Sequence, residues 1–310
     1  MKKILLSICI PTYNREKLLR ECLDSIVSQS REKNIFSRVE IIISDNNSAD
    51  KTREMVGGYK KLYKNIRYFR NKTTIPGDEN IIKSAFYAKG DYIWFFGDDD
   101  IHYRWSLEIL IDVIDKYHPD GIKCNLDLSS KKGSKILDRN MINLTKDVMV
   151  KTKKELFSFL ETKFFMHLDW YITCQSNTII SRALFKKNLK RVMKYYNPKT
   201  ANFLHNGFIF YNDTDYKIYL ISKPLAIYRG YNMFGSQEGI NSPKFLTNWH
   251  KLLKRHNDLI CKINKKNISA KFRLLLFLKN ATRDIRLILI RYFGYDISGL
   301  LIKLFHRKEV

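Results

Sequence analysis

The chain has 310 residues, of which 45% are hydrophobic and 28% charged, so it is not an intrinsically disordered protein. Its length allows one large domain with an appendage. Lysine and arginine total 56 against 31 aspartate and glutamate residues, and the net charge of +25 favours anionic partners: nucleic acid, phosphorylated substrates or an anionic membrane. The five widely spaced cysteines include no CxxC pair, which predicts reduced thiols in a cytosolic setting. No stretch of about 18 residues is apolar and uncharged, so we expect no membrane-spanning helix.

Strands and helices are expected to alternate through the first 128 residues. The patterns predict strands at 4–10, 39–43, 66–70, 91–96 and 122–128, and helices at 16–29, 50–64, 78–88 and 105–117. This alternation, with near-continuous apolar strands, predicts an α/β fold with a Rossmann-like, mostly parallel sheet flanked by helices. In such sheets ligands bind at the carboxyl ends of the strands.

Three consecutive carboxylates, Asp98, Asp99 and Asp100, follow the apolar run Tyr92–Phe96. Ionised carboxylates repel one another and are costly to bury, so we expect this strand to deliver them to a rim where a cation neutralises them. A solvated acidic turn is the alternative. The polar exits of two other strands, Pro11–Arg15 and Asp45–Ser48, are expected at the same edge, which joins the three segments into one site.

The second half of the chain is predicted to hold a loop at 129–140 between further strands and helices. Helices are expected at 152–165 and 181–194, and strands at 174–180 and 216–221. Beyond about residue 240 the chain becomes helical, with lysine and arginine among leucine, isoleucine and phenylalanine. Such basic amphipathic helices can lie in a membrane interface, and the alternative is a helical cap with a solvated basic face.

Three segments resemble family 2 glycosyltransferases, which have the GT-A fold: Ser7–Arg15, Ile43–Thr52 and Gly90–Asp100. Their order and spacing match the amino-terminal half of that family, and a weaker match continues to about residue 230. The phrase Phe-Gly-Asp-Asp-Asp also resembles a bacterial subgroup of surface-polysaccharide enzymes that includes abequosyltransferase-like proteins.

The resemblance implies a division of the chain into a catalytic domain and a tail. The GT-A catalytic domain would cover residues 1–235, with a nucleotide-binding half at 1–125 and an acceptor-binding half at 126–235. A basic amphipathic helical region would follow at 240–310.

The resemblance also implies roles for residues on the donor side. The residues that would line the nucleotide pocket are Pro11, Thr12, Tyr13 and Arg15, with Asp45 accepting a hydrogen bond from the base and Asn71 and Lys83 near the nucleotide or its phosphates. Tyr13 would offer its ring to the base, which is typically uracil in this family.

The family binds its metal ion with a DxD sequence. In this chain the position of the first aspartate of that sequence is occupied by Gly97. We therefore expect Asp99 as the main metal ligand, Asp98 near the ribose, and Asp100 as second ligand or support. The cofactor would be Mn²⁺ or Mg²⁺, which stabilises the charge that develops on a diphosphate leaving group.

An inverting transfer also needs a general base for the acceptor hydroxyl. The acidic pair of the family would fall on Leu204–Asn206, which contains no carboxylate. His205 is one candidate because imidazole titrates near neutral pH. Asp169, in a segment expected to border the acceptor site, is the other candidate. A third possibility is that neither of these two residues is the base.

The leading hypothesis is a metal-dependent, inverting enzyme that transfers a sugar from a nucleotide-sugar donor to a growing, lipid-linked cell-surface glycan. The expected donor is a UDP-sugar. It would be cytoplasmic, with peripheral contact to the anionic inner membrane. The missing acidic base motivates an alternative, a degenerate scaffold without turnover. A nucleic-acid-binding protein is suggested by charge alone, and without a recognition helix, RNP-like strand or zinc module we expect no nucleic-acid partner.

Overall fold

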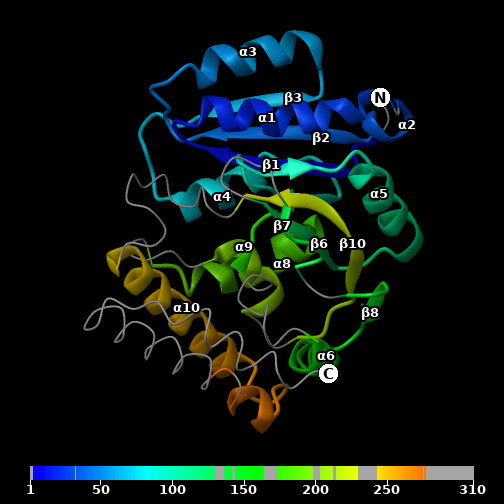
Figure 1. Ribbon diagram of the computed structural model, residues 1–310, viewed down its shortest axis with the longest axis vertical. Coiled ribbons are helices and arrows are strands. Elements are labelled where there is room, and N and C mark those ends of the chain that lie inside the picture. Colours follow the sequence, from blue (N-terminus) through cyan, green and yellow to red (C-terminus); the bar gives the residue numbers. More distant parts are fainter. Residues whose placement is uncertain are drawn as a thin grey trace.

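The computed structural model describes residues 3–31, 33–129, 136–141, 144–163, 173–197, 203–211, 214–229, 243–274 and 276. The strands within these ranges form one curled sheet of ten strands, flanked by helices (Figure 1). In the described part of the chain, no helix has both the length and the apolar character to cross a membrane.

The amino-terminal half of the chain builds a parallel block in the order β3–β2–β1–β4. The strands are β1 (Leu6–Thr12), β2 (Val39–Asp45), β3 (Ile66–Arg70) and β4 (Tyr92–Phe95), and the three pairings are parallel. Nearly every side chain of β1, β2 and β4 is buried, which explains their near-continuous apolar sequences. The expected parallel sheet is therefore confirmed for this half.

Helices connect these parallel strands, as the alternating pattern predicts. They are α1 (Glu16–Val27), α3 (Thr52–Leu62) and α4 (Gly77–Phe86), with the short η1 (Ser28–Arg31) and α2 (Lys33–Phe36) after α1. Apolar residues at three- and four-residue steps face inward on α1, where Leu19, Leu23 and Ile26 are fully buried. In Figure 1, α1 and α3 lie at the top of the molecule with β1, β2 and β3.

The second half makes the sheet mixed rather than parallel throughout. β9 (Thr178–Ser181) lies between β4 and β6 (Gly121–Ser129) and is antiparallel to both. β10 (Ile218–Tyr228) is parallel to β6, with register shifts around Pro224. Two reversals of direction leave β6 and β10 parallel to β4, so their carboxyl ends share its edge.

Three short strands complete the sheet by antiparallel pairing, namely β5 (Ile101–His102), β7 (Ile136–Asp138) and β8 (Val148–Val150). β5 and β8 pair with β10, and β7 pairs with β6. β7 lies inside the segment predicted as a loop, because a pairing of so few residues has no readable sequence period.

The remaining described helices are α5 (Ser106–Tyr117), α6 (Lys153–Lys163), α8 (Arg182–Met193), α9 (Leu204–Phe210) and α10 (Pro243–Ile263). α8 begins where predicted, and Ser181 caps it by accepting a hydrogen bond of 3.1 Å from Leu184 N. α9 was not predicted, since all of its residues are buried and it shows no amphipathic period. α10 bears out the expected helical character after residue 240, and the helices expected beyond residue 276 lie outside the described residues.

Candidate active site

The three predicted strand exits meet at the carboxyl edge of the parallel block. Thr12, at the end of β1, donates a hydrogen bond of 2.7 Å from Oγ1 to Asp98 Oδ2, just past β4. The main-chain nitrogen of Asn46, just past β2, donates to Thr12 O at 2.8 Å. These two bonds join the ends of three neighbouring strands into one rim.

Arg15 provides the positive charge that faces the acid run. Its Nη1 lies 2.9 Å from Asp98 Oδ1 and 3.3 Å from Asp99 Oδ2. Both oxygens of Asp98 are thus held by the protein, one by Thr12 and one by Arg15. One guanidinium shared by two carboxylates lowers their mutual repulsion, which allows Asp98 to be buried.

Asp99 has the most available oxygen of the three carboxylates. No neighbouring side chain in the described residues bonds to its Oδ1, and its side chain is 13% exposed. Burial, and then the charge of Asp98, raise the pKa of Asp99 above its ordinary value. An added cation would relieve this repulsion most directly at Asp99.

Asp100 is committed to the protein on both of its oxygens. Arg229 N donates to Oδ1 at 2.9 Å, and Ser176 Oγ donates to Oδ2. Burial, and then Asp99, raise the pKa of Asp100. Of the two expected roles for Asp100, these contacts favour support over metal ligation.

Gly97 explains the unusual start of the acidic sequence. A Cβ atom at this position would lie 3.1 Å from both Asp99 Oδ1 and Asp100 Oδ2, and 3.4 Å from Ser176 Oγ. Its main-chain nitrogen also donates to Ser176 Oγ at 2.9 Å. A larger residue at position 97 would crowd the two following carboxylates.

The chemistry of this rim fits a divalent cation that is completed by the donor. No three histidine, cysteine or acidic side chains are grouped as a full ligand set within the described ranges. Mg²⁺ and Mn²⁺ do not require one, because one or two carboxylates commonly hold such an ion together with substrate phosphates and water. Asp99 Oδ1 offers a protein ligand of this kind.

Asp45 lies fully buried on the other side of Thr12. Its Oδ1 accepts a hydrogen bond of 2.8 Å from Ser48 N, its Oδ2 accepts one from Tyr68 Oη, and Arg70 Nε lies 3.7 Å from Oδ2. The carboxylate is therefore fixed at the end of β2. Tyr13, by contrast, is 46% exposed and presents its ring to solvent at the rim.

Asn71 holds the loop after β3 in place. Its Nδ2 donates to Asn46 Oδ1 at 2.9 Å and to Asn80 Oδ1 at 3.1 Å. Ile75 N also donates to Asn46 Oδ1, at 3.0 Å. Pro11 lies within β1 next to Thr12, and Lys83 is half-buried on α4, so the structure brings neither into contact with the acid run.

Arg229 and Ser176 belong to the site but were missed by sequence reasoning. The buried Arg229 guanidinium donates to Asp99 O through Nε and pairs with Glu21 on α1 through Nη1. Its one sequence signal was its position at the end of the phrase Pro-Leu-Ala-Ile-Tyr-Arg. Ser176 gave no signal, because a lone serine before a strand has no distinctive pattern.

Of the two candidate bases, the structure describes His205. His205, on α9, is 3% exposed, and its Nε2 lies 3.0 Å from Thr173 O. Its ring packs near Phe95 and Phe203, and burial lowers the pKa of His205 to about 3. These contacts give no support to His205 as a base near neutral pH. Asp169 lies outside the described residues.

Lys123 lies buried in a polar cluster that includes Asn206, the chain neighbour of His205, and that the sequence did not reveal. Its Nζ donates to Asn206 Oδ1 at 2.7 Å, to Thr178 Oγ1 at 2.9 Å and to Asn177 Oδ1. Because these residues come from β6, from α9 and from the start of β9 with the residue before it, the cluster fixes α9 against the sheet. Burial lowers the pKa of Lys123 to about 7.

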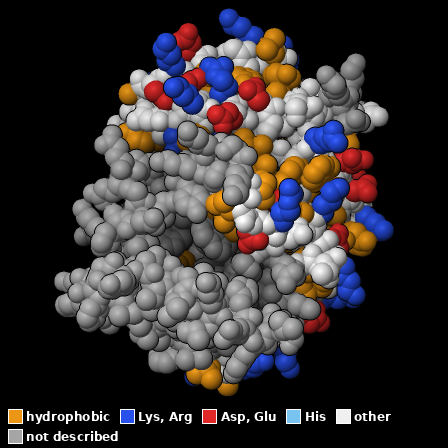
Figure 2. Space-filling model, in the orientation of Figure 1, with side chains coloured by type: hydrophobic (Ala, Val, Ile, Leu, Met, Phe, Trp, Pro, Cys, Tyr) orange, Lys and Arg blue, Asp and Glu red, His pale blue; other side chains and the backbone are white. Residues whose placement is uncertain are grey.

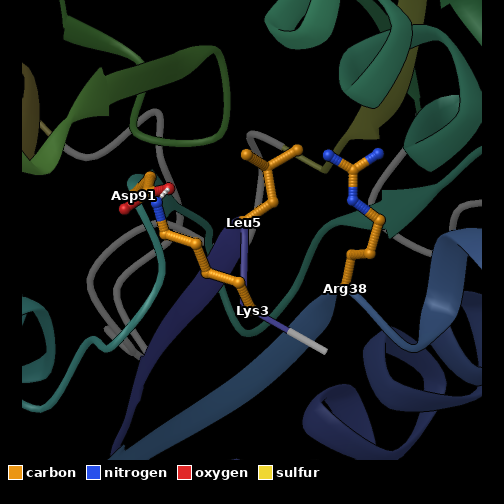
Figure 3. Close-up of a pocket in the computed structure, with 4 residues that line it drawn as sticks. All are labelled: Lys3, Leu5, Arg38 and Asp91. Atoms are coloured by element: carbon orange, nitrogen blue, oxygen red, sulfur yellow. Dashed lines mark ion pairs between the residues drawn. The ribbon is translucent and has the colours of Figure 1, made fainter. Parts of the chain in front are cut away.

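A pocket of about 250 Å³ lies at the opposite edge of the sheet (Figure 3). Leu5, Arg38 and Asp91 lie just before β1, β2 and β4, and Lys3 pairs with Asp91 at 2.8 Å. Ligands of parallel sheets bind at the carboxyl edge, so this pocket is separate from the donor rim.

Comparisons with known proteins agree with this architecture. The model of glycosyl transferase family 2 matches residues 7–189. Abequosyltransferase RfbV of Salmonella typhimurium is 31% identical over 277 residues, which cover 86% of this chain and 78% of that protein. A Campylobacter jejuni glucosyltransferase, named for GalNAc(5)-diNAcBac-PP-undecaprenol, is 32% identical over 49% of this chain and 50% of its own length.

Solved structures show the same fold at lower identity. Staphylococcus aureus TarS in complex with UDP-GlcNAc superposes with a TM-score of 0.60 and 18% identity, covering 95% of this chain and 74% of that one. The mannosyltransferase PcManGT of Pyrobaculum calidifontis, in complex with GDP-Man and Mn²⁺, gives 0.57 and 12%, covering 97% and 79%. With the sequence matches, these likenesses show that the chain belongs to glycosyl transferase family 2, as an enzyme with the GT-A fold.

Proposed function

We propose that the protein is an inverting glycosyltransferase that moves a sugar from a UDP-sugar to a growing, lipid-linked cell-surface glycan. The observation that carries the proposal is the rim formed by Thr12, Arg15 and Asp98, with Asp99 Oδ1 available beside it. This arrangement offers an anionic ligand for a cation and a guanidinium for a diphosphate at one edge. The name of the Campylobacter glucosyltransferase supports a saccharide acceptor, and that of the abequosyltransferase RfbV supports sugar transfer.

The donor would lie across the ends of β1, β2 and β4. Tyr13 would stack on the base, and Asp45 would accept from it through the carboxylate that Ser48 and Tyr68 hold in place. Asp98 would lie near the ribose and Asp99 would bind the metal ion. Pro11 would form part of the pocket wall, with Asn71 and Lys83 beside the phosphates.

Mn²⁺ or Mg²⁺, when bound, would supply positive charge to the leaving diphosphate. Arg15 adds charge of the same sign and lies between two carboxylates, so its guanidinium is already oriented before the donor arrives. Asp100 does not need to touch the ion in this account. It would hold the acid run in place through Ser176 and Arg229.

The acceptor hydroxyl would be deprotonated from the face opposite the diphosphate. We infer Asp169 as the base, since burial lowers the pKa of the other candidate, His205, to about 3. The catalytic domain would cover residues 1–235, with its nucleotide-binding half at 1–125 and its acceptor-binding half at 126–235. The basic region at 240–310 would contact an anionic membrane from the cytoplasmic side.

A donor panel tests this function. Purified protein with Mn²⁺ is expected to hydrolyse a UDP-sugar slowly without acceptor and to transfer it faster with a lipid-linked one. Asp99→Ala and Asp169→Asn should each abolish both hydrolysis and transfer. Asp169→Asn should nevertheless leave UDP binding intact. Failure of every nucleotide sugar to turn over, with nucleotide still bound, would instead identify a scaffold.

A further inference from the structure

A second concave site lies between the end of α8 and α10. It is a groove of about 460 Å³, lined by Lys194, Tyr195, Tyr196 and Asn197 on one side and by Arg255, Asp258, Leu259 and Lys262 on the other. None of these residues belongs to the donor rim. In Figure 1, α10 crosses the lower left of the molecule, below α8 and α9.

One end of the groove is joined to the catalytic edge. Tyr196 Oη donates a hydrogen bond of 2.5 Å to Glu79 Oε1, in the first turn of α4. α4 follows the loop that leaves the carboxyl edge, and Asn46 Nδ2 ties that loop to the rim by donating to Ile75 O at 2.7 Å. The groove therefore begins beside the edge that carries the acid run.

The lining combines aromatic rings with cations. Tyr195 and Tyr196 are half-buried, so each ring offers a fixed apolar face with a hydroxyl at its tip. Lys194, Arg255 and Lys262 place ammonium and guanidinium groups along the same groove. Asp258 is the one acidic residue in the lining, and its oxygens can accept from sugar hydroxyls.

The two helices that border the groove carry further positive charge. Exposed cations on the two helices include Lys186, Lys187, Lys190, Arg191, Lys251 and Lys254. α8 contains no acidic residue. By contrast, Figure 2 shows basic and acidic side chains interspersed over the upper part of the visible face. Net positive charge beside a concave aromatic site favours an anionic ligand.

We propose that the groove binds a phosphate-bearing saccharide. This saccharide is the part of the acceptor that continues from the sugar that carries the reacting hydroxyl. Tyrosine rings would stack on sugar faces, and the lysine and arginine heads would pair with phosphate oxygens. The concave shape suits a chain of sugars better than a flat bilayer. This inference rests on the proposed function and deepens it by giving the acceptor a second binding site and a charge.

Glucose 1-phosphate is a suitable probe, because it carries one sugar ring and one phosphate. The donor site is first saturated with UDP and Mg²⁺, and the probe is then titrated by calorimetry or ligand-observed NMR. The double variant Lys194→Glu/Lys262→Glu is expected to bind the probe at least about tenfold more weakly than wild type. Lys60→Glu/Lys61→Glu, an equal charge change on exposed residues of α3, is the matched control and should bind like wild type.

Three outcomes would overturn the proposal. One is the absence of probe binding to the wild-type protein, and another is an equal loss in both double variants, which would indicate bulk electrostatics. The third is a groove variant that keeps probe binding but no longer binds vesicles of phosphatidylglycerol, since the surface would then serve a membrane. UDP binding, measured on the same samples, reports on the proposed function separately.

Discussion

Thr12 Oγ1 and Asp98 Oδ2 are 2.7 Å apart although 86 residues separate them in the sequence. Thr12 ends β1 and Asp98 follows β4, so this one bond sets the spacing between two neighbouring strand exits. It also turns the other oxygen of Asp98 toward Arg15, at 2.9 Å. The donor rim is thus held by a hydroxyl and a guanidinium before any ligand binds.

Thr12→Val removes that hydroxyl while keeping the shape of the side chain. One oxygen of the buried Asp98 then lacks its partner, at a cost of about 1–3 kcal/mol. We expect UDP affinity in Mn²⁺ to fall by roughly tenfold or more, measured by calorimetry. Thr12→Ser keeps the hydroxyl and should restore most of the affinity, and equal affinities for the valine and serine variants would contradict this role.

Ser176→Ala should disturb the acid run from the acceptor side. The substitution leaves both Gly97 N and Asp100 Oδ2 without their partner. We expect unfolding free energy to fall by about 1–3 kcal/mol in urea, together with weaker Mn²⁺ binding in the presence of UDP. Ser37→Ala, at an exposed serine, is the control and should leave both measurements near wild type.

Gly97→Ala tests the close packing behind the two carboxylates. The new methyl group would lie 3.1 Å from Asp99 Oδ1 and Asp100 Oδ2, so one or both must shift. We expect a loss of metal-dependent UDP binding of roughly tenfold. Gly57→Ala, at a helical glycine with nothing within 4 Å, should instead raise the melting temperature slightly. Unchanged metal and UDP binding in Gly97→Ala would show that the carboxylates tolerate movement.

Acid should destabilise the fold through two buried imidazoles. Burial lowers the pKa values of His102 and His205 to about 3, below the unfolded value near 6.5. The unfolded chain therefore takes up protons first as pH falls, and stability present above about pH 6.5 is lost progressively toward about pH 3. Each residue should cost about 1.4 kcal/mol of unfolding free energy per pH unit in that window.

His102→Leu offers a direct measurement of this effect. Both ring nitrogens of His102 are buried and have no hydrogen-bond partner among the described residues. The leucine variant should lose less stability than wild type between about pH 7 and pH 5 when unfolded in urea. Identical pH dependence in the two proteins would mean that His102 titrates normally.

Much of the donor side could be predicted because its signals are local. Apolar strands that end in Pro11–Arg15, Asp45–Ser48 and Asp98–Asp100 place these segments at one edge once a parallel sheet is assumed. The structure confirms the edge and adds the bonds that join it. Local pattern could not show Ser176, just before β9, or the main chain of Arg229, just after β10, and both reach the acid run.

The acceptor side was harder to predict for a physical reason. β9 lies between β4 and β6 and is antiparallel to both. Its short apolar sequence does not indicate in which direction it runs. α9 is buried on every side, so it lacks the amphipathic period of a surface helix. His205 consequently looked like a residue of an open site, whereas α9 carries it into the core.

Asp99 is proposed to bind the metal ion that in turn binds the donor diphosphate. Calorimetric titration of UDP into wild type, Asp99→Asn and Asp100→Asn, each with and without Mn²⁺, tests it most directly. We predict that Mn²⁺ tightens UDP binding to wild type by roughly tenfold or more and has no effect on Asp99→Asn. A smaller but measurable Mn²⁺ effect should remain in Asp100→Asn. Undiminished Mn²⁺ enhancement in Asp99→Asn would show that Asp99 is not the metal ligand.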